Sequence, residues 1–365
     1  MTRTMFLCLL LTLTTVVSAK DGWTVDEFMA ETGVREGPVA TRELPRWSAT
    51  PTILLRPRAV ADREIADKFP DANFIFVDSA SELAANATKA DAIIGFCDAS
   101  AIAAAADLVW VQIYSAGVER CLAVDELGSG DVMLTNMQKM SSPAIGEHAV
   151  AMAMSLARGL IRHSKAMPEG EWRRGLTQDP GTFSVSGKTM LVVGLGGIGS
   201  AAAKRASGLG MRVIAVRNSS REGPEYVDYV GLSHELGQLM GEADIIVNAL
   251  PLTSSTRGLF DQAMFDQARQ GAYFINVGRG GTVITDDLVK ALESGRLAGA
   301  GLDVTDPEPL PSDHPLWQMP NVIITPHVSW FGADQRLHNT LLRENVRRFL
   351  AGDALLNVVD PERGY

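Results

Sequence analysis

The 365-residue chain has only three cysteines, few aromatic residues and more acidic than basic side chains. With a formal net charge of −10, it has no basic surplus to attract a nucleic-acid backbone, so we expect no nucleic-acid partner. Cysteine and histidine nowhere show the spacing of metal ligands, and no metal site is expected. Low-complexity runs and short repeats are also absent. The 46% hydrophobic content, with aromatics at only 6%, suits a large α/β core packed by Ala, Val, Leu and Ile.

The most continuous apolar run lies at the N-terminus. Arg3 precedes the stretch MFLCLLLTLTTVV, Val17-Ser18-Ala19 supplies small residues at a cleavage position, and the chain turns polar at Lys20. This is the pattern of a secretory signal peptide, because the run is too short to be a good membrane span. We expect residues 1–19 to be removed and the protein to be secreted or periplasmic, without stable membrane insertion. An uncleaved anchor is one alternative, and a misassigned start, which would leave the protein in the cytoplasm, is another.

Cleavage at that position would leave two cysteines, Cys97 and Cys121. An oxidising compartment would permit a disulfide between them. The sequence leaves this pairing open, because it does not show whether their Cα atoms are within reach.

Short apolar strands alternate with helical stretches in two parts of the chain. The first series starts at residues 52, 73, 92, 109 and 132, and the second comprises TMLVVG, MRVIAV, DIIVNAL, AYFINV, GAGLDV and NVIITP. Such alternation predicts parallel sheets covered by helices on both faces. A long helical run is expected from Ser142 to Met167. A second, after Pro326, is expected to pack back onto the first series.

The second series opens on a glycine-rich turn, TMLVVGLGGIG, between a β-branched run and a helical stretch. Gly194 allows the tight turn, Gly196 lets a pyrophosphate approach the helix N-terminus, and Gly199 lets helix and strand pack closely. Gly197 and Ile198 complete the loop. The strand–turn–helix setting predicts a dinucleotide-binding site here.

The turn after the next strand is expected to contact the adenosine ribose. An NAD-preferring site usually has an acid at its start, whereas this chain has Arg217 and continues RNSSR. Arg217 and Arg221 flank Ser219 and can hold a ribose 2′-phosphate by charge and planar hydrogen bonding. We therefore expect NADP, with NAD as the alternative cofactor. The other interpretation of this turn is a solvated basic loop.

Three later strands each end near a residue suited to ketone chemistry: Arg279, Glu308 and His327. They are expected to converge, because ligands bind outside the carboxyl ends of the strands of an open parallel sheet. Arg279 can clamp the carboxylate and ketone oxygens of a 2-oxo acid. His327 can give the proton that the ketone oxygen needs after hydride delivery. Glu308 can orient the imidazole and favour its charged form.

In this order the motifs resemble those of the D-isomer-specific 2-hydroxyacid dehydrogenase family, over roughly residues 50 to 350. The similar segments are GLGGIG, PLTSSTRGLF, FINVGRGGTVITDDLVKAL, GAGLDVTDPEPLP and ITPHVSW. The resemblance implies an α/β fold of two doubly wound parallel-sheet domains, a flavodoxin-like substrate domain and a Rossmann dinucleotide-binding domain, commonly dimeric. It also implies catalytic roles for Arg279, Glu308 and His327.

Further site residues follow from the same resemblance. Asp303 would contact the nicotinamide carboxamide, and backbone amides of a glycine turn would hold the substrate carboxylate. The expected cofactor-lining residues are Leu252, Thr256 and Val277, and the expected glycine turn is Ser115, Ala116 and Gly117.

The expected organisation places an N-terminal arm at residues 20–50 after the signal peptide. The substrate domain would span 51–142 and be completed by 328–365. The dinucleotide-binding domain would span 143–327.

Arg217, in place of the usual acid, resembles the NADP-using glyoxylate/hydroxypyruvate reductase branch. The leading hypothesis is therefore NADP-dependent reduction of a small 2-oxo acid to a 2-hydroxy acid. A non-catalytic dinucleotide-responsive binding protein is the alternative, because transcriptional corepressors share this fold and triad. Formate dehydrogenation is disfavoured, since that branch pairs Gln with His rather than Glu with His. The substrate side chain stays open, because first-domain loops would set it.

Overall fold

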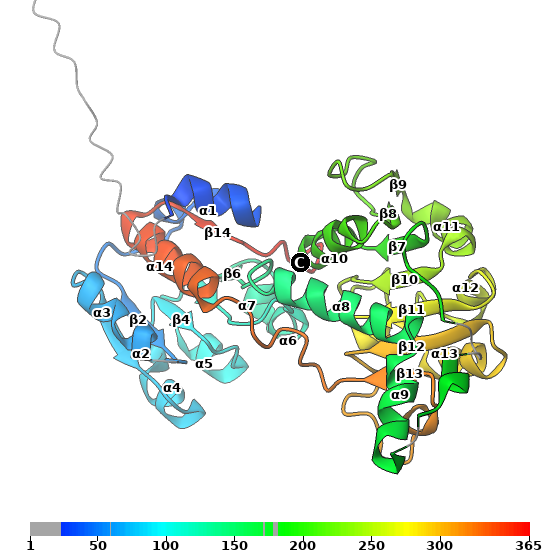
Figure 1. Ribbon diagram of the computed structural model, residues 1–365. Coiled ribbons are helices and arrows are strands. Elements are labelled where there is room, and N and C mark those ends of the chain that lie inside the picture. Colours follow the sequence, from blue (N-terminus) through cyan, green and yellow to red (C-terminus); the bar gives the residue numbers. More distant parts are fainter. Residues whose placement is uncertain (1–22, 59, 171, 178–181) are drawn as a thin grey trace, which may run out of the picture.

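The protein is described here by a computed structural model that covers residues 23–58, 60–170, 172–177 and 182–365. The predicted signal peptide, residues 1–19, lies outside the described residues. Two lobes are visible in Figure 1, each built on a parallel sheet, with the long helix α8 beginning between them. The chain passes from the first lobe to the second before α8 and returns after strand β13.

The first lobe contains a five-stranded parallel sheet in the order β3-β2-β4-β5-β6. Its strands are β2 (Thr52–Leu55), β3 (Asn73–Phe76), β4 (Ala92–Ile94), β5 (Trp110–Gln112) and β6 (Met133–Thr135). This is the flavodoxin-like order, so the doubly wound fold and these five predicted strands are confirmed.

The second lobe contains a seven-stranded parallel sheet in the order β13-β12-β11-β10-β7-β8-β9. The strands are β7 (Thr189–Val193), β8 (Arg212–Val216), β9 (Tyr229–Gly231), β10 (Ile245–Asn248), β11 (Ala272–Asn276), β12 (Leu297–Leu302) and β13 (Val322–Ile324). The order reverses between β7 and β10, which is where an open parallel sheet forms a ligand crevice. The predicted Rossmann fold is confirmed, and only the short edge strand β9 was missed.

Helices cover both faces of each sheet. They are α1 (Val25–Thr32), α2 (Val60–Arg63), α3 (Ile65–Lys68), α4 (Ala80–Asn86), α5 (Ala99–Ala104), α6 (Glu119–Leu122), α7 (Asp125–Gly128), α8 (Ser142–Ala157), α9 (Leu160–Ala166), α10 (Gly197–Gly208), α11 (Leu236–Glu242), α12 (Gln262–Asp266), α13 (Thr285–Glu293) and α14 (Gln335–Ala351). One core of the second lobe joins its sheet to α8 and α10, and the other joins it to α11, α12 and α13.

The first and last strands of the described chain pair with each other on the first lobe. Strand β1 (Glu36–Ala40) pairs antiparallel with β14 (Ala354–Leu356). Phe28 of α1 and Leu341 of α14 enter the same core cluster as Ile53 of the sheet. The interpretation of residues 20–50 as an arm therefore missed a helix and a strand, because their partner lies at the other end of the sequence.

Two helix predictions were wrong in their boundaries. The run from Ser142 to Met167 breaks at Gly159, whose φ of +65° ends α8 before α9 begins. The segment after Pro326 does not enter its helix until Gln335, at an Asp334 cap that accepts a hydrogen bond from Arg336 N. Residues 327–334 form turns instead.

Cys97 and Cys121 form a disulfide, with Cα atoms 5.5 Å apart. That separation is ordinary for a bridged pair, so the question that the sequence left open is answered. In the described part of the chain, no helix is both long and apolar enough to span a membrane.

Candidate active site

The glycine loop joins β7 to α10 at the ligand crevice. Gly194 has a φ of +96°, which a residue with a Cβ adopts only at a cost. A Cβ at Gly199 would overlap the Gly194 carbonyl oxygen, whereas a Cβ at Gly196 would meet no atom within 4 Å. The loop therefore packs closely at Gly199, whereas the space beside Gly196 is empty. Its free helix N-terminus fits the pyrophosphate of a dinucleotide, with Gly197 and Ile198 in the first turn.

The two arginines of the ribose turn differ in their surroundings. Arg221 Nη2 lies 2.8 Å from Glu235 Oε2, and its Nη1 donates to the Tyr229 hydroxyl at 2.9 Å. Hydrogen bonds from the Leu232 backbone, Tyr229 and Arg221 lower the pKa of Glu235 to about 2. Glu235 is therefore ionised at neutral pH and balances the charge of Arg221.

Arg217 makes a different contact. It donates from Nη1 to the Glu222 carbonyl at 2.9 Å, and no ion pair to it is found within the described residues. Its neighbour Ser219 is exposed. Of the two predicted arginines, Arg217 is thus the one whose charge is not balanced by a carboxylate.

A buried polar network supports the loop that carries Arg279. Asn248 Nδ2 donates to Asn276 Oδ1 at 3.0 Å and to Thr282 Oγ1 at 2.7 Å. Thr282 Oγ1 in turn donates to the Arg279 carbonyl at 2.7 Å. The sequence analysis missed these three residues. Polar side chains inside strands that are otherwise apolar, such as Asn248 and Asn276, were the available signal.

The loop that begins with the sequence PLT, residues 251–256, lies beside this network. Thr256 Oγ1 donates to the Pro251 carbonyl at 2.7 Å and accepts from Thr253 N at 2.8 Å, which closes the loop on itself. A Cβ at Gly281 would lie 3.1 Å from the Leu252 side chain. Val277 is buried directly after β11. These positions keep Leu252, Thr256 and Val277 near the crevice, and their contacts with a cofactor stay predictions.

The structure brings Arg279 from the second lobe onto the predicted glycine turn of the first. A Cβ at Gly117 would overlap Arg279 Nη2, so only glycine allows this approach. Asn136 Nδ2 donates to the Ala116 carbonyl at 2.8 Å, and Ser115 Oγ donates to the Gly117 carbonyl at 2.8 Å. Among the residues described, nothing accepts from the backbone N–H groups of Ala116 and Gly117. The Arg279 guanidinium therefore lies against a turn whose two backbone N–H donors have no acceptor in the described structure, and such donors suit a carboxylate.

His327 and Glu308 form a close pair. His327 Nδ1 lies 2.7 Å from Glu308 Oε1, and the two side chains are 42% and 44% exposed. His327 has a φ of +55°, and its backbone N–H donates to the Asp303 carbonyl at 2.8 Å. Because Nδ1 faces the carboxylate, Nε2 is the nitrogen available to a substrate.

Asp303 anchors the loop that carries His327. Its buried carboxylate accepts from Thr325 Oγ1 at 2.6 Å, Val328 N at 2.9 Å and Ser329 N at 3.1 Å. His148 Nε2 of α8 lies 3.0 Å from Thr325 Oγ1 and extends this network to α8. The expected nicotinamide contact of Asp303 stays a prediction, whereas its support of the His327 loop is a contact that the sequence did not reveal.

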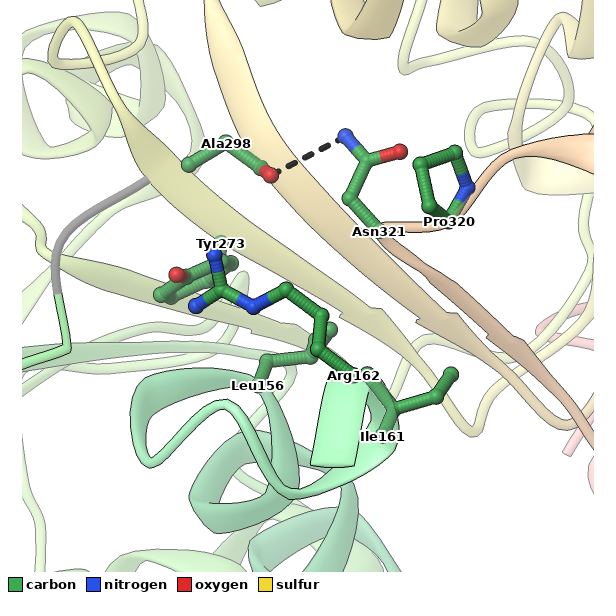
Figure 2. Close-up of a pocket in the computed structure, with 7 residues that line it drawn as sticks. All are labelled: Leu156, Ile161, Arg162, Tyr273, Ala298, Pro320 and Asn321. Atoms are coloured by element: carbon green, nitrogen blue, oxygen red, sulfur yellow. Dashed lines mark hydrogen bonds between the residues drawn. The ribbon is translucent and has the colours of Figure 1, made fainter. Parts of the chain in front are cut away.

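The cavity in Figure 2 is not this site. It measures about 280 Å³ and is lined by residues that include Tyr273, Ala298 and Asn321, near the amino ends of β11, β12 and β13. Asn321 Nδ2 donates there to the Ala298 carbonyl at 3.0 Å (Figure 2). Ligands of such sheets bind at the opposite, carboxyl ends of the strands. We assign the cavity no catalytic role.

The fold is that of a dinucleotide-dependent dehydrogenase, and its second lobe carries both Arg279 and the His327–Glu308 pair. The model of the D-isomer specific 2-hydroxyacid dehydrogenase NAD-binding domain matches residues 150–329. The chain belongs to the D-isomer specific 2-hydroxyacid dehydrogenase family.

Individual relatives agree with this assignment. The human glyoxylate reductase/hydroxypyruvate reductase is 32% identical over 250 residues, which cover 68% of this chain and 75% of that protein. Glyoxylate/hydroxypyruvate reductase B of Klebsiella pneumoniae subsp. pneumoniae is 33% identical over 66% of this chain and 74% of that one.

Solved structures agree as well. The 2-hydroxyacid dehydrogenase from Xanthobacter autotrophicus Py2, in complex with NADPH and MES, superposes with a TM-score of 0.75 at 28% identity. The match covers 87% of this chain and all of that one. The NADPH-dependent glyoxylate/hydroxypyruvate reductase from Sinorhizobium meliloti, in complex with NADP and sulfate, has a TM-score of 0.74 at 27% identity over the same shares.

Proposed function

We propose that the protein reduces a small 2-oxo acid, such as glyoxylate or hydroxypyruvate, to the 2-hydroxy acid with NADPH. The observation that carries this proposal is the contact of Arg279, from the second lobe, with the Ser115–Gly117 turn of the first lobe, whose Ala116 and Gly117 N–H groups have no acceptor among the described residues. The human and Klebsiella relatives, both named as reductases of glyoxylate and hydroxypyruvate, support the substrate class. The NADP(H) bound in two similar structures supports the cofactor.

In this proposal each catalytic residue has a separate role in substrate binding or proton transfer. Arg279 and the turn amides hold the carboxylate, and the guanidinium also hydrogen-bonds the ketone oxygen. When bound, NADPH supplies the hydride that reaches the ketone carbon. His327 Nε2 gives its proton to the oxygen as negative charge develops there. Glu308 keeps the imidazole oriented through its bond to Nδ1.

The decisive assay is NADPH oxidation by the purified protein, followed by absorbance across a panel of 2-oxo acids. Turnover with glyoxylate or hydroxypyruvate supports an enzyme of this class. NADPH binding without turnover of any 2-oxo acid would instead support the non-catalytic dinucleotide-responsive alternative.

Cofactor preference is expected to depend on Arg217 rather than Arg221. Arg217→Ala should raise the KM for NADPH by about tenfold to hundredfold, because a charge-assisted bond to the 2′-phosphate is lost. The KM for NADH should change little. Arg221→Ala is the matched control and should leave NADPH affinity nearly intact, since Glu235 already balances that arginine. Equal kinetics with NADPH and NADH in the unmodified enzyme would contradict the proposal.

We also propose export, with the mature chain beginning at Lys20. The residue pattern 1–19 supports this, and the disulfide between Cys97 and Cys121 suits an oxidising compartment. N-terminal sequencing of protein from the native host should read Lys20 first. Ala19→Arg removes the small residue at the cleavage site and should yield the longer, unprocessed chain. An intact Met1 on unmodified cytoplasmic protein would count against processing.

The proposed domain boundaries are those expected from the sequence, 51–142 with 328–365 and 143–327. The entry of α14 into the core of the first lobe supports assigning the C-terminal segment to the substrate domain.

A homodimer is proposed as well. Leu160, Met167 and Trp172 are 54%, 75% and 90% exposed in one stretch of chain, and exposed apolar patches of this kind mark association surfaces.

A further inference from the structure

The side chain of Arg279 has a carboxylate partner that the proposed mechanism does not use. Arg279 Nε donates to Glu119 Oε1 at 2.9 Å, and Nη1 donates to the Gly278 carbonyl at 2.8 Å. Glu119 begins α6, two residues after Gly117, and therefore belongs to the first lobe. The pair joins residues that are 160 positions apart in the chain.

This contact decides which edge of the guanidinium faces a substrate. Glu119 occupies the Nε side, and the Gly278 carbonyl takes one N–H of Nη1. Nη2 lies over Gly117, where Glu119 Oε2 also lies 2.8 Å from the position that a Cβ would take, next to a turn whose Ala116 and Gly117 N–H groups have no acceptor among the described residues. A planar guanidinium binds a carboxylate well only in one orientation. An arginine side chain that is already fixed by other contacts therefore loses less conformational entropy when the substrate binds.

We propose that Glu119 is a positioning residue, which holds Arg279 in the orientation that binds the substrate carboxylate. The inference rests on the proposed function, in which Arg279 binds that carboxylate. Glu119 touches no reacting atom, and its negative charge by itself would repel the substrate. Its contribution is therefore a hydrogen bond of fixed geometry, and an uncharged acceptor should serve almost as well.

The first experiment compares Glu119→Ala with Glu119→Gln in steady-state kinetics. E119A should raise the KM for glyoxylate about tenfold, with a smaller change in kcat and none in the KM for NADPH. E119Q retains an Oε1 acceptor and should restore the KM for glyoxylate to near the unmodified value. Glu242→Ala is the matched control, because Glu242 is about as exposed as Glu119 and pairs with Arg212 at 3.0 Å, at the amino end of β8.

Each other outcome contradicts the proposal. A KM that falls in E119A would show that the charge only weakens substrate binding, and an unchanged KM would show no positioning. A rise of equal size in E119A and E119Q would assign the effect to charge. In an Arg279→Ala background, E119A should add nothing further, and an additive effect would place Glu119 outside the action of Arg279.

A binding measurement separates this inference from the proposed function. Calorimetry with oxamate, an unreactive 2-oxo acid analogue, needs no turnover. If the unmodified enzyme reduces no 2-oxo acid, the proposed function fails, yet E119A should still bind oxamate about tenfold more weakly. Equal oxamate affinity in the two proteins, or no binding to either, would overturn the role of Glu119.

Discussion

His327→Ala should lower kcat for 2-oxo acid reduction by about 10²–10⁴-fold, the usual contribution of a positioned proton donor. Alanine leaves the developing negative charge on the ketone oxygen without a proton. NADPH affinity, measured by fluorescence, should stay nearly intact, because the glycine loop and Arg217 lie elsewhere in the second lobe. His163→Ala on α9 is the matched control and should leave kcat unchanged.

Glu308→Gln tests how His327 is held. Glutamine can accept the bond from Nδ1 but removes the negative charge beside the imidazole. The kcat of E308Q should therefore fall, but by less than that of H327A, because the bond that orients the imidazole is kept. Near-normal turnover in H327A would refute the catalytic assignment, although the fold would be unaffected.

Arg279→Ala should reduce kcat/KM for glyoxylate by about 10²–10³-fold, because one preorganised donor to the developing oxyanion is lost together with the carboxylate clamp. Most of the effect should appear as a higher KM, with a further fall in kcat. Arg279→Lys is the informative companion, since it retains the charge but loses the planar fork.

The lysine variant distinguishes charge from geometry. If R279K recovers most of the activity, charge alone binds the substrate, and neither the fork nor its Glu119 support matters. If R279K resembles R279A, orientation dominates. A normal KM for glyoxylate in R279A would remove Arg279 from the substrate site altogether.

Much of the fold was predictable because its signals are local. Strands β2 and β7 were predicted because each is a run of four or five consecutive, mostly apolar residues. The elements that were missed depend on remote partners: β1 contains Pro38 and pairs with β14 at the other end of the chain. The break at Gly159 was hidden because a single glycine interrupts an otherwise helical pattern only when it adopts a positive φ.

In the candidate site, too, the residues with local sequence signals were predicted and the remote residues that contact them were not. The glycine loop, Arg279, Glu308 and His327 were found because strand ends and glycine turns are visible in the sequence. The side chains that hold them were not, because Glu119 reaches Arg279 across 160 positions and His148 reaches Thr325 across 177. The sequence predicts that Arg221 holds a phosphate, whereas in the structure Arg221 pairs with Glu235.

The sequence by itself determined which groups are available for the proposed chemistry: a glycine loop for a dinucleotide, an arginine for a carboxylate and a histidine–glutamate pair for a proton. Periodicity and turn residues encode these locally, within a few positions of each group. Only the tertiary structure decided how the groups are oriented. Orientation depends on contacts between lobes and between strands, such as Glu119 with Arg279 and Asp303 with the His327 loop, and such contacts leave no local pattern in the chain.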